Sequence, residues 1–295
     1  MMKRLFLIAT LFLSAFSLFA DDKEELVDGK FKVSGVSGLN ISQTQLNNWA
    51  AGGENSVAGT VYLNGKAVRK SGNWLWTTNL ALEYGLTKLK TQGVRKVGDK
   101  IDFSTQMGYK ATDKLYYTAM ADFKSQFAKG YNYKNDTKGP YISKFLAPGY
   151  SNVSIGLDYR PKDFFSLYFS PVASKMTFVT DKELSDRGEF GVDPGDKFRV
   201  EFGTYLKARF EKELVKNVKV ISTADFFTAY SKDFGNVDVN WDLLISMKVN
   251  KFLSANINTT LKYDDDVKSI DKNGNKRGPK VQFKEVLGVG FAYNF

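Results

Sequence analysis

The side chains that could do chemistry in this sequence are carboxylates, amines, guanidinium groups and hydroxyls. The 295 residues contain no His and no Cys, and they include 42 Lys and Arg and 32 Asp and Glu. A Ser-His or Cys-His nucleophilic dyad, a thiolate metal site and a disulfide framework therefore lack their reagents. An Asp pair or a Ser-Lys dyad stays conceivable, but we expect no enzyme and no cofactor.

The acidic residues near the C-terminus resemble the start of a calcium loop. Asp271, Asn273 and Asn275 alternate as calcium ligands do, and an acidic run at 264–266 lies nearby. Such a loop needs Gly at its sixth position and Glu at its twelfth, where this sequence has Lys and Gln282. We therefore expect no metal site.

Two other groups of residues could act on a solute. Lys197, Arg199, Lys207 and Arg209 share one parity of an alternating segment, so they form either a basic stripe that selects anions or a lattice of ion pairs with acidic neighbours. The second group, in a polar loop, could fold inward as a constriction or form an ordinary external loop with a buried Trp. It consists of Trp49, Gly52, Gly53 and Glu54.

The elements that must position these groups are β-strands, because hydrophobic residues recur with a period of two from about residue 31 to the end. The predicted strands are 31–43, 55–69, 73–88, 99–111, 114–128, 150–160, 164–177, 197–212, 217–231, 237–249, 252–264 and 280–295. Short turns alternate with longer polar loops, an arrangement typical of an outer-membrane barrel with periplasmic turns and extracellular loops. Pro171 cannot donate to a strand ladder, and the parity shifts after it, which predicts a bulge in 164–177.

The sorting of charge decides between a barrel in water and a barrel in lipid. One parity of each strand is apolar, whereas the other carries most of the Lys, Arg, Asp and Glu. Charges inside a dry soluble barrel would cost several kcal/mol each without partners, so we predict a wet, charged interior and a lipid-facing exterior. Outward aromatic residues also cluster near the short turns, as an interfacial girdle does: Trp74, Trp76, Tyr109, Tyr117, Tyr159, Phe165, Phe210 and Tyr293.

The two ends of the chain carry addressing signals. Residues 1–20 combine Lys3 and Arg4, an apolar run and Ala20, which predicts a cleaved secretory signal peptide, and 21–30 form a short periplasmic stub before the barrel of 31–295. The alternating end with Phe291, Tyr293 and Phe295 is similar to the C-terminal signal that the barrel-insertion machinery of Gram-negative outer membranes reads. We therefore expect export and residence in the outer membrane.

The string Asn-Trp-Ala-Ala-Gly-Gly-Glu-Asn at 48–55, followed by Trp-Leu-Trp-Thr-Thr-Asn at 74–79 and Glu-Tyr-Gly-Leu at 83–86, resembles a Bacteroidota outer-membrane barrel family of unknown function, the type called domain of unknown function 3078. The resemblance runs through most of the mature chain. It implies a location and a fold, and no catalytic or binding residue comes with it.

Two kinds of function fit these observations. The first is a narrow diffusion channel or transport barrel for small solutes, since a barrel of about twelve strands lies between the filled interiors of eight-stranded barrels and the open pores of sixteen-stranded ones. The second is a structural or scaffold barrel with a closed lumen that acts as a subunit of an outer-membrane complex. The expected partners are membrane lipid, lipopolysaccharide, the insertion machinery and a protein in the membrane. We expect no nucleic acid.

Overall fold

The structure of the protein is a computed structural model, which describes residues 27–45, 55–90, 93–134, 137–231, 234–250, 253–270 and 276–295. The predicted signal peptide and the loop with Trp49, Gly52, Gly53 and Glu54 lie outside these residues, as do the residues 271–275. Among the described residues, no helix is long and apolar enough to cross a membrane.

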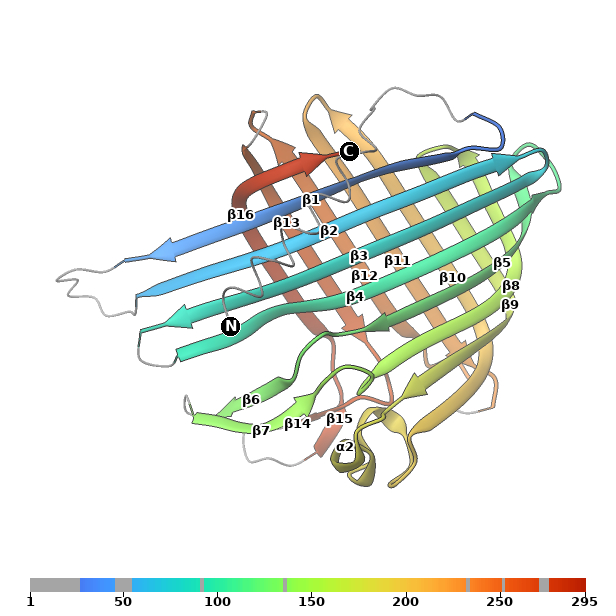
Figure 1. The fold of residues 1–295 in the computed structure, drawn as a ribbon. Helices are drawn as coiled ribbons and strands as arrows, with labels where there is room; N and C mark the ends of the chain where they lie inside the picture. The colour runs from blue at the N-terminus through green and yellow to red at the C-terminus, as the bar shows by residue number, and fades with distance from the viewer. Residues whose placement is uncertain are drawn as a thin grey trace.

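Twelve strands pair antiparallel into a closed barrel (Figure 1). They are β1 (Phe31–Thr44), β2 (Ser56–Ser71), β3 (Trp74–Leu89), β4 (Gly93–Lys110), β5 (Leu115–Ser125), β8 (Gly149–Lys162), β9 (Phe165–Phe178), β10 (Phe198–Val215), β11 (Val218–Ala229), β12 (Asp238–Lys248), β13 (Leu253–Tyr263) and β16 (Gln282–Asn294). Strands next to each other in the chain are neighbours in the barrel, and β1 pairs with β16 to close it. The predicted fold class is confirmed.

Small elements occupy the long connections at one end, called the loop end below. They are the hairpins β6–β7 (Gly130–Lys134 and Thr137–Ser143) and β14–β15 (Lys268–Ile270 and Lys276–Pro279), the helix α2 (Lys182–Asp186) and the 3-10 helix η1 (Glu189–Gly191). The opposite end, called the turn end, holds the short connections and the C-terminal Phe295. In the β2–β3 turn Gly72 has a φ of +54°, which favours glycine there.

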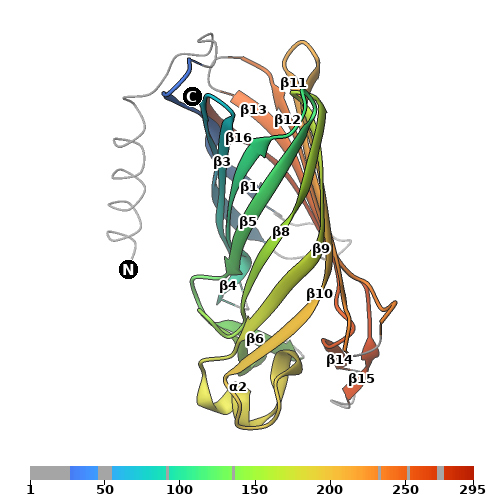
Figure 2. The same cartoon turned by 90° about the vertical axis from the view of Figure 1, so that its right-hand side faces the viewer.

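The alternation of side chains between the two faces follows the prediction. Outward positions hold exposed apolar residues such as Ile155, Phe202 and Leu287, whereas the inward positions of the same strands hold Asp158, Lys207 and Lys284. On the outside near the turn end, the rings of Trp74 and Tyr109 contact each other edge to face, with centroids 5.1 Å apart. Seen at 90° to the first view, the barrel is narrow, with β3 and β5 in one wall and β11 and β12 in the other (Figure 2).

The predicted bulge lies where it was expected. Against both β8 and β10, the register of β9 gains one residue between Phe169 and Ala173, so Pro171 and Val172 both face outward. The Ser170 hydroxyl fills the gap, donating to the carbonyl of Ile155 at 2.8 Å. Beyond the bulge the inward positions change from even to odd numbers, as Tyr168 and Lys175 show.

One predicted connection is wrong. The interval 89–98 was expected to be a long loop, but β4 begins at Gly93, and only 90–92 connect it to β3. The register shifts between Gly85 and Leu86, because Gly85 pairs with Gly98 and Leu86 with Lys96. Val97 is therefore an extra residue that breaks the period of two. Because the bulge changes the parity, the hydrophobic pattern did not predict the part of β4 before Gly98 as strand.

Candidate functional site

The lumen of the barrel is the candidate site, because the inward positions gather the charged side chains of the described residues. The basic stripe predicted on β10 is placed partly as expected. Lys197 is exposed and precedes the strand, whereas Arg199, Lys207 and Arg209 all point inward. They extend from the loop end to the turn end, so they do not converge on one point.

Each of the three inward members has an acidic partner. Arg199 pairs with Glu201 and, at 2.8 Å, with Asp266. Lys207 lies 3.4 Å from Asp225, and Arg209 lies 2.9 Å from Glu211. This geometry matches the lattice alternative for these residues, and anion selection by the stripe stays a prediction.

Other ion pairs cross the lumen and join its two walls. Lys66 of β2 lies 3.3 Å from Glu211 of β10, and Lys100 of β4 lies 2.9 Å from Asp242 of β12. In both pairs the two strands are six apart around the twelve-stranded ring, so they stand on opposite sides. Lys124 of β5 reaches Asp225 of β11 at 2.7 Å. These bridges subdivide the lumen.

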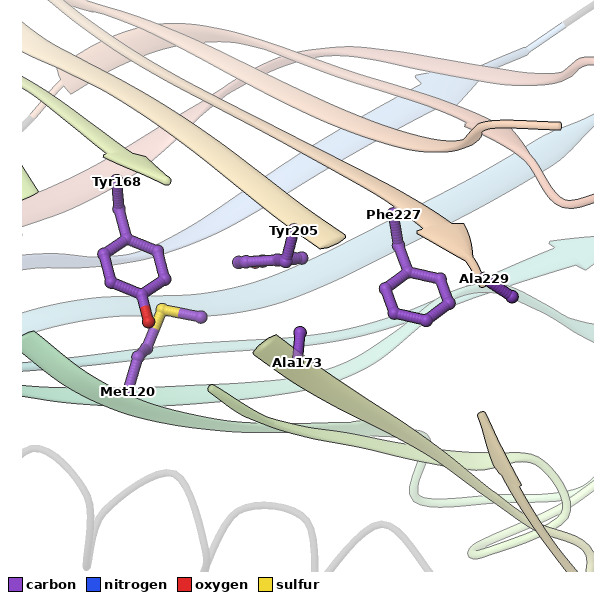
Figure 3. Close-up of a cluster of buried hydrophobic side chains, with 6 residues drawn as sticks. All are labelled: Met120, Tyr168, Ala173, Tyr205, Phe227 and Ala229. Atoms are coloured by element: carbon purple, nitrogen blue, oxygen red, sulfur yellow. The ribbon is translucent and has the colours of Figure 1, made fainter. Parts of the chain in front are cut away.

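Aromatic and apolar side chains obstruct the lumen beside these pairs. Figure 3 shows the cluster of Met120, Tyr168, Ala173, Tyr205, Phe227 and Ala229 between the ribbons. The rings of Tyr168 and Tyr205 are tilted, with centroids 6.2 Å apart. Their hydroxyls are held as well: Tyr168 donates to Ser154 at 3.0 Å and Tyr205 to Asp225 at 2.6 Å.

A polar cavity of about 120 Å³ remains between the walls. Side chains from both walls line it, among them Lys66, Lys100, Glu211 and Asp242. Asn79 Oδ1, which belongs to another lining residue, is buried and has no hydrogen-bond partner among the described residues. A polar cavity of this size has room for several water molecules. The cavity can therefore hold water or a small hydrophilic solute.

A small apolar cluster anchors the loops at the loop end. Ala147, Val179, Leu184 and Val192 are buried together there, with Tyr141 and Phe190 packed against them. Asp181 ties the cluster to polar partners, because its carboxylate accepts hydrogen bonds from the Leu184 N–H at 3.0 Å and the Tyr141 hydroxyl at 3.0 Å, and lies 2.5 Å from Lys144 Nζ. Burial raises the pKa of Asp181, but these contacts outweigh burial and lower the pKa to about 2.

The loop lysines are also engaged within the protein. The amine of Lys129 stands 4.4 Å from the ring centroid of Tyr141, and that of Lys138 stands 3.8 Å from the ring centroid of Tyr131. Such cation–π contacts stabilise a hairpin by about 0.5–1 kcal/mol each when exposed. The contact with lipopolysaccharide that the sequence predicts stays a prediction.

The three residues of the predicted insertion signal end the closing strand. Phe291 and Tyr293 face outward and are exposed, whereas Phe295 is buried. The rings of Tyr293 and Phe295 are stacked, with centroids 6.3 Å apart. Alternation alone predicts that Phe295 is as exposed as Phe291, so the burial of Phe295 is seen only in the tertiary structure.

The acidic residues near the predicted calcium loop have protein partners. Asp264 accepts a hydrogen bond from Lys175 at 3.2 Å, and Asp266 pairs with Arg199. Within the described part of the chain, no group of acidic residues has the geometry of a metal site.

Comparison with solved structures finds other barrels at low sequence identity. The COG4313 outer membrane channel from Pseudomonas putida F1 is 10% identical, with 94% of this chain and 99% of that chain covered and a TM-score of 0.40. The translocator domain of the autotransporter NalP from Neisseria meningitidis is 11% identical, with 98% of this chain and 95% of that chain covered and a TM-score of 0.30. OmpT, an outer membrane protein of Vibrio cholerae, is 7% identical, with 92% of this chain and 100% of that chain covered and a TM-score of 0.31. The fold assignment rests on the strand pairing described above.

No curated protein matches the sequence. A family match is found in the first strands of the barrel and the connections between them, from β1 to β6. Residues 41–131 of this chain match the family described as "Protein of unknown function (DUF3078)", which confirms the resemblance over that segment.

Proposed function

We propose that this protein is a β-barrel of the Gram-negative outer membrane that serves as a narrow conduit for small hydrophilic solutes. The proposal includes export by the predicted signal peptide and insertion by the machinery that recognises the C-terminal strand.

The membrane location is supported by the outer surface. Large apolar side chains at outward positions are unusually exposed, including Ile155 and Leu287 at 68% and Val172 at 66%. Soluble proteins seldom expose contiguous apolar patches of more than a few hundred Å². The aromatic residues near the turn end, such as Trp74 and Tyr117, fit the girdle of a lipid interface.

The observation that carries the conduit is the polar cavity between the walls. Its walls are joined by ion pairs such as Lys100–Asp242, beside a small buried apolar cluster of Val36, Tyr62 and Leu244. Both side chains are partly exposed, at 30% and 23%, so they contact the cavity. Solutes would pass in a narrow path beside the ion pairs, which form the constriction.

Planar-bilayer recording of the purified full-length protein tests this function. We expect small conductance steps from the wild type and larger steps from Lys100→Ala with Asp242→Ala, because the double variant removes a bridge and keeps the net charge of the lumen unchanged. The control is Lys182→Ala with Asp186→Ala, an exposed pair on α2. Silence from the wild type and both variants would contradict the conduit.

The loop with Trp49 and Glu54 is proposed as an additional constriction. If it folds inward, Trp49→Ala with Glu54→Ala should raise the conductance on top of the lumen variant. An unchanged conductance would place this loop outside the path.

The alternative function is a closed scaffold barrel in an outer-membrane complex. The cluster around Tyr168 and Tyr205 favours it, because it fills part of the lumen with side chains that are 1% and 5% exposed. A scaffold predicts silence in bilayers and recovery of a stoichiometric partner protein after mild detergent extraction. Its lumen variants would change stability and leave transport unaffected.

A further inference from the structure

Near the turn end of the lumen, the carboxylate of Glu211 is surrounded by three cations. Arg209 Nη2 lies 2.9 Å from one carboxylate oxygen of Glu211, Lys66 Nζ lies 3.3 Å from the same oxygen, and Lys219 Nζ lies 2.9 Å from the other. The four residues, called the Glu211 cage below, come from β2, β10 and β11 and therefore from both walls.

The cage has more positive than negative charge. Three cations and one carboxylate leave an excess of two positive charges within the four residues. Arg160, the next basic residue in this region, is balanced by Asp158 at 2.7 Å. The excess therefore belongs to the cage itself.

The opposite end of the lumen has the reverse balance. There Lys175 and Arg199 are paired with a larger group of carboxylates. These are Glu201, Asp238, Asp264 and Asp266. The charged groups are thus sorted along the barrel axis, with an acidic loop end and a basic turn end, and the sorting makes the cage the more favourable end of the lumen for a small anion.

The cage also has space and a spare donor. All four of its residues line the polar cavity. Arg209 Nε is buried and has no hydrogen-bond partner among the described residues. The side chains of Lys66 and Lys219 are 26% and 39% exposed, so their amines can be reached from the cavity.

We propose that the Glu211 cage is a binding site for small oxyanions, the class that carboxylates and phosphates share. Glu211 is the resident carboxylate that holds the cations in place when no solute is bound. An incoming oxyanion accepts charge-assisted hydrogen bonds from Lys66, Arg209 and Lys219 and displaces the Glu211 carboxylate toward the cavity. The inference deepens the proposed function, because it names the solute class, but binding itself does not require conduction.

Calorimetric titration of the full-length protein in detergent micelles with inorganic phosphate tests the site. Glu211→Gln keeps the side-chain shape and removes the competing charge, so phosphate should bind about tenfold more tightly than to the wild type. Adding Lys219→Met to this variant should abolish the gain. A parallel titration of the wild type with acetate distinguishes the two sources: tighter binding of phosphate points to a phosphate-type solute, and tighter binding of acetate points to a carboxylate.

The matched control is Glu83→Gln. Glu83 is also an inward carboxylate, and it bonds to Lys284 at 2.7 Å, but among the described residues it contacts one cation instead of three. Glu83 lines the same cavity at a distance from the cage, so its neutralisation should raise the phosphate affinity by much less than the tenfold expected for Glu211→Gln. An equal gain in this control, or no gain in Glu211→Gln, would overturn the site.

The fold and the conduit are tested apart from the site. If Glu211→Gln does not fold, as judged by protease resistance and circular dichroism, Lys219→Met alone replaces it as the test variant. This variant should bind phosphate more weakly than the wild type does. Phosphate binding with silent bilayers would refute the conduit and leave the site standing. Conduction without phosphate binding in any variant would refute the site and leave the conduit standing.

Discussion

Gly35 and Phe295 face each other across the seam that closes the barrel. The Gly35 N–H donates to the Phe295 carbonyl at 2.7 Å, and the Phe295 N–H donates to the Gly35 carbonyl at 3.1 Å. The phenyl ring lies against the glycine, since a Cβ at residue 35 would stand 2.5 Å from its Cζ. Phe295 is 3% exposed, so the last residue of the chain is among its most buried hydrophobic ones.

This contact predicts that Gly35→Ala impairs closure. The added methyl group would meet the Asn64 carbonyl oxygen of β2 as well as the Phe295 ring, so it must displace the ring and a strand, and overpacking of this kind destabilises by about 1–3 kcal/mol. The measurement is the protease-resistant fraction after folding into lipid vesicles. Gly65 pairs with Gly35 in β2 and has open space at its Cβ position, so Gly65→Ala is the control and should fold normally. Equal folding of both variants would show that the seam tolerates the methyl group.

The insertion signal predicts a defect in cells. Removing Tyr293 to Phe295 deletes the outward Tyr293 ring and the Phe295 contact with Gly35, so the chain should accumulate unassembled and protease-sensitive in the periplasm. Fractionation followed by protease treatment measures it. Normal outer-membrane levels of the truncated chain would remove the basis for a signal in these residues.

The cross-lumen pair of Lys100 and Asp242 predicts a double-mutant signature. Lys100→Ala alone leaves the Asp242 carboxylate, which also accepts a hydrogen bond from Thr260 at 2.7 Å, without its cation. The free energy of unfolding in urea should fall by about 1–3 kcal/mol for either single variant, and by less than the sum for the double one. The exposed pair of Lys182 and Asp186 should change it by under about 1 kcal/mol. Additive effects at Lys100 and Asp242 would show that the two are not coupled.

The lowered pKa of Asp181 predicts that the loop end loses stability at low pH. Its folded pKa of about 2 lies below its ordinary 3.8, so the stabilisation is complete above pH 4 and is lost as the pH falls toward 2. Hydrogen exchange of the α2 amides, corrected for the intrinsic pH effect, should speed up over this interval in the wild type. In Asp181→Asn the corrected rate should be raised at pH 6 and should not change with pH. An identical pH profile in both proteins would exclude Asp181 as the acid-sensitive group.

The bulge in β9 predicts opposite outcomes for two deletions. Removing Pro171 takes out the one extra residue, so Lys175 stays inward, where it bonds to Asp238. Removing Ser174 instead turns Lys175 toward lipid, at a cost of about 2–4 kcal/mol near the membrane midplane and less near an interface. We expect the first variant to fold into vesicles and the second to fold with much lower yield. Similar yields would show that the faces beyond Pro171 are not fixed by the bulge.

The sequence predicts the local features of this barrel well because each strand shows its own period of two. The bulge at Pro171 could be predicted because a proline and a parity change coincide. The bulge at Val97 could not be predicted, since glycines there offered no parity to follow until Gly85 and Gly98 were paired. The partners of Lys66 and Glu211 could not be found either, because 145 residues separate them and only the closed barrel brings them together.

The cross-lumen pairs divide the chain into a donor half and an acceptor half. Lys66, Lys100 and Lys124 all precede residue 125, and Glu211, Asp242 and Asp225 all follow residue 210. A fragment that ends before β10 thus holds three interior ammonium groups without their partners in the opposite wall, and of the three Lys100 has a carboxylate on its own strand, Asp102 at 3.8 Å. The partners in the opposite wall arrive only with the second half of the chain, so these three bridges can form only as the barrel closes.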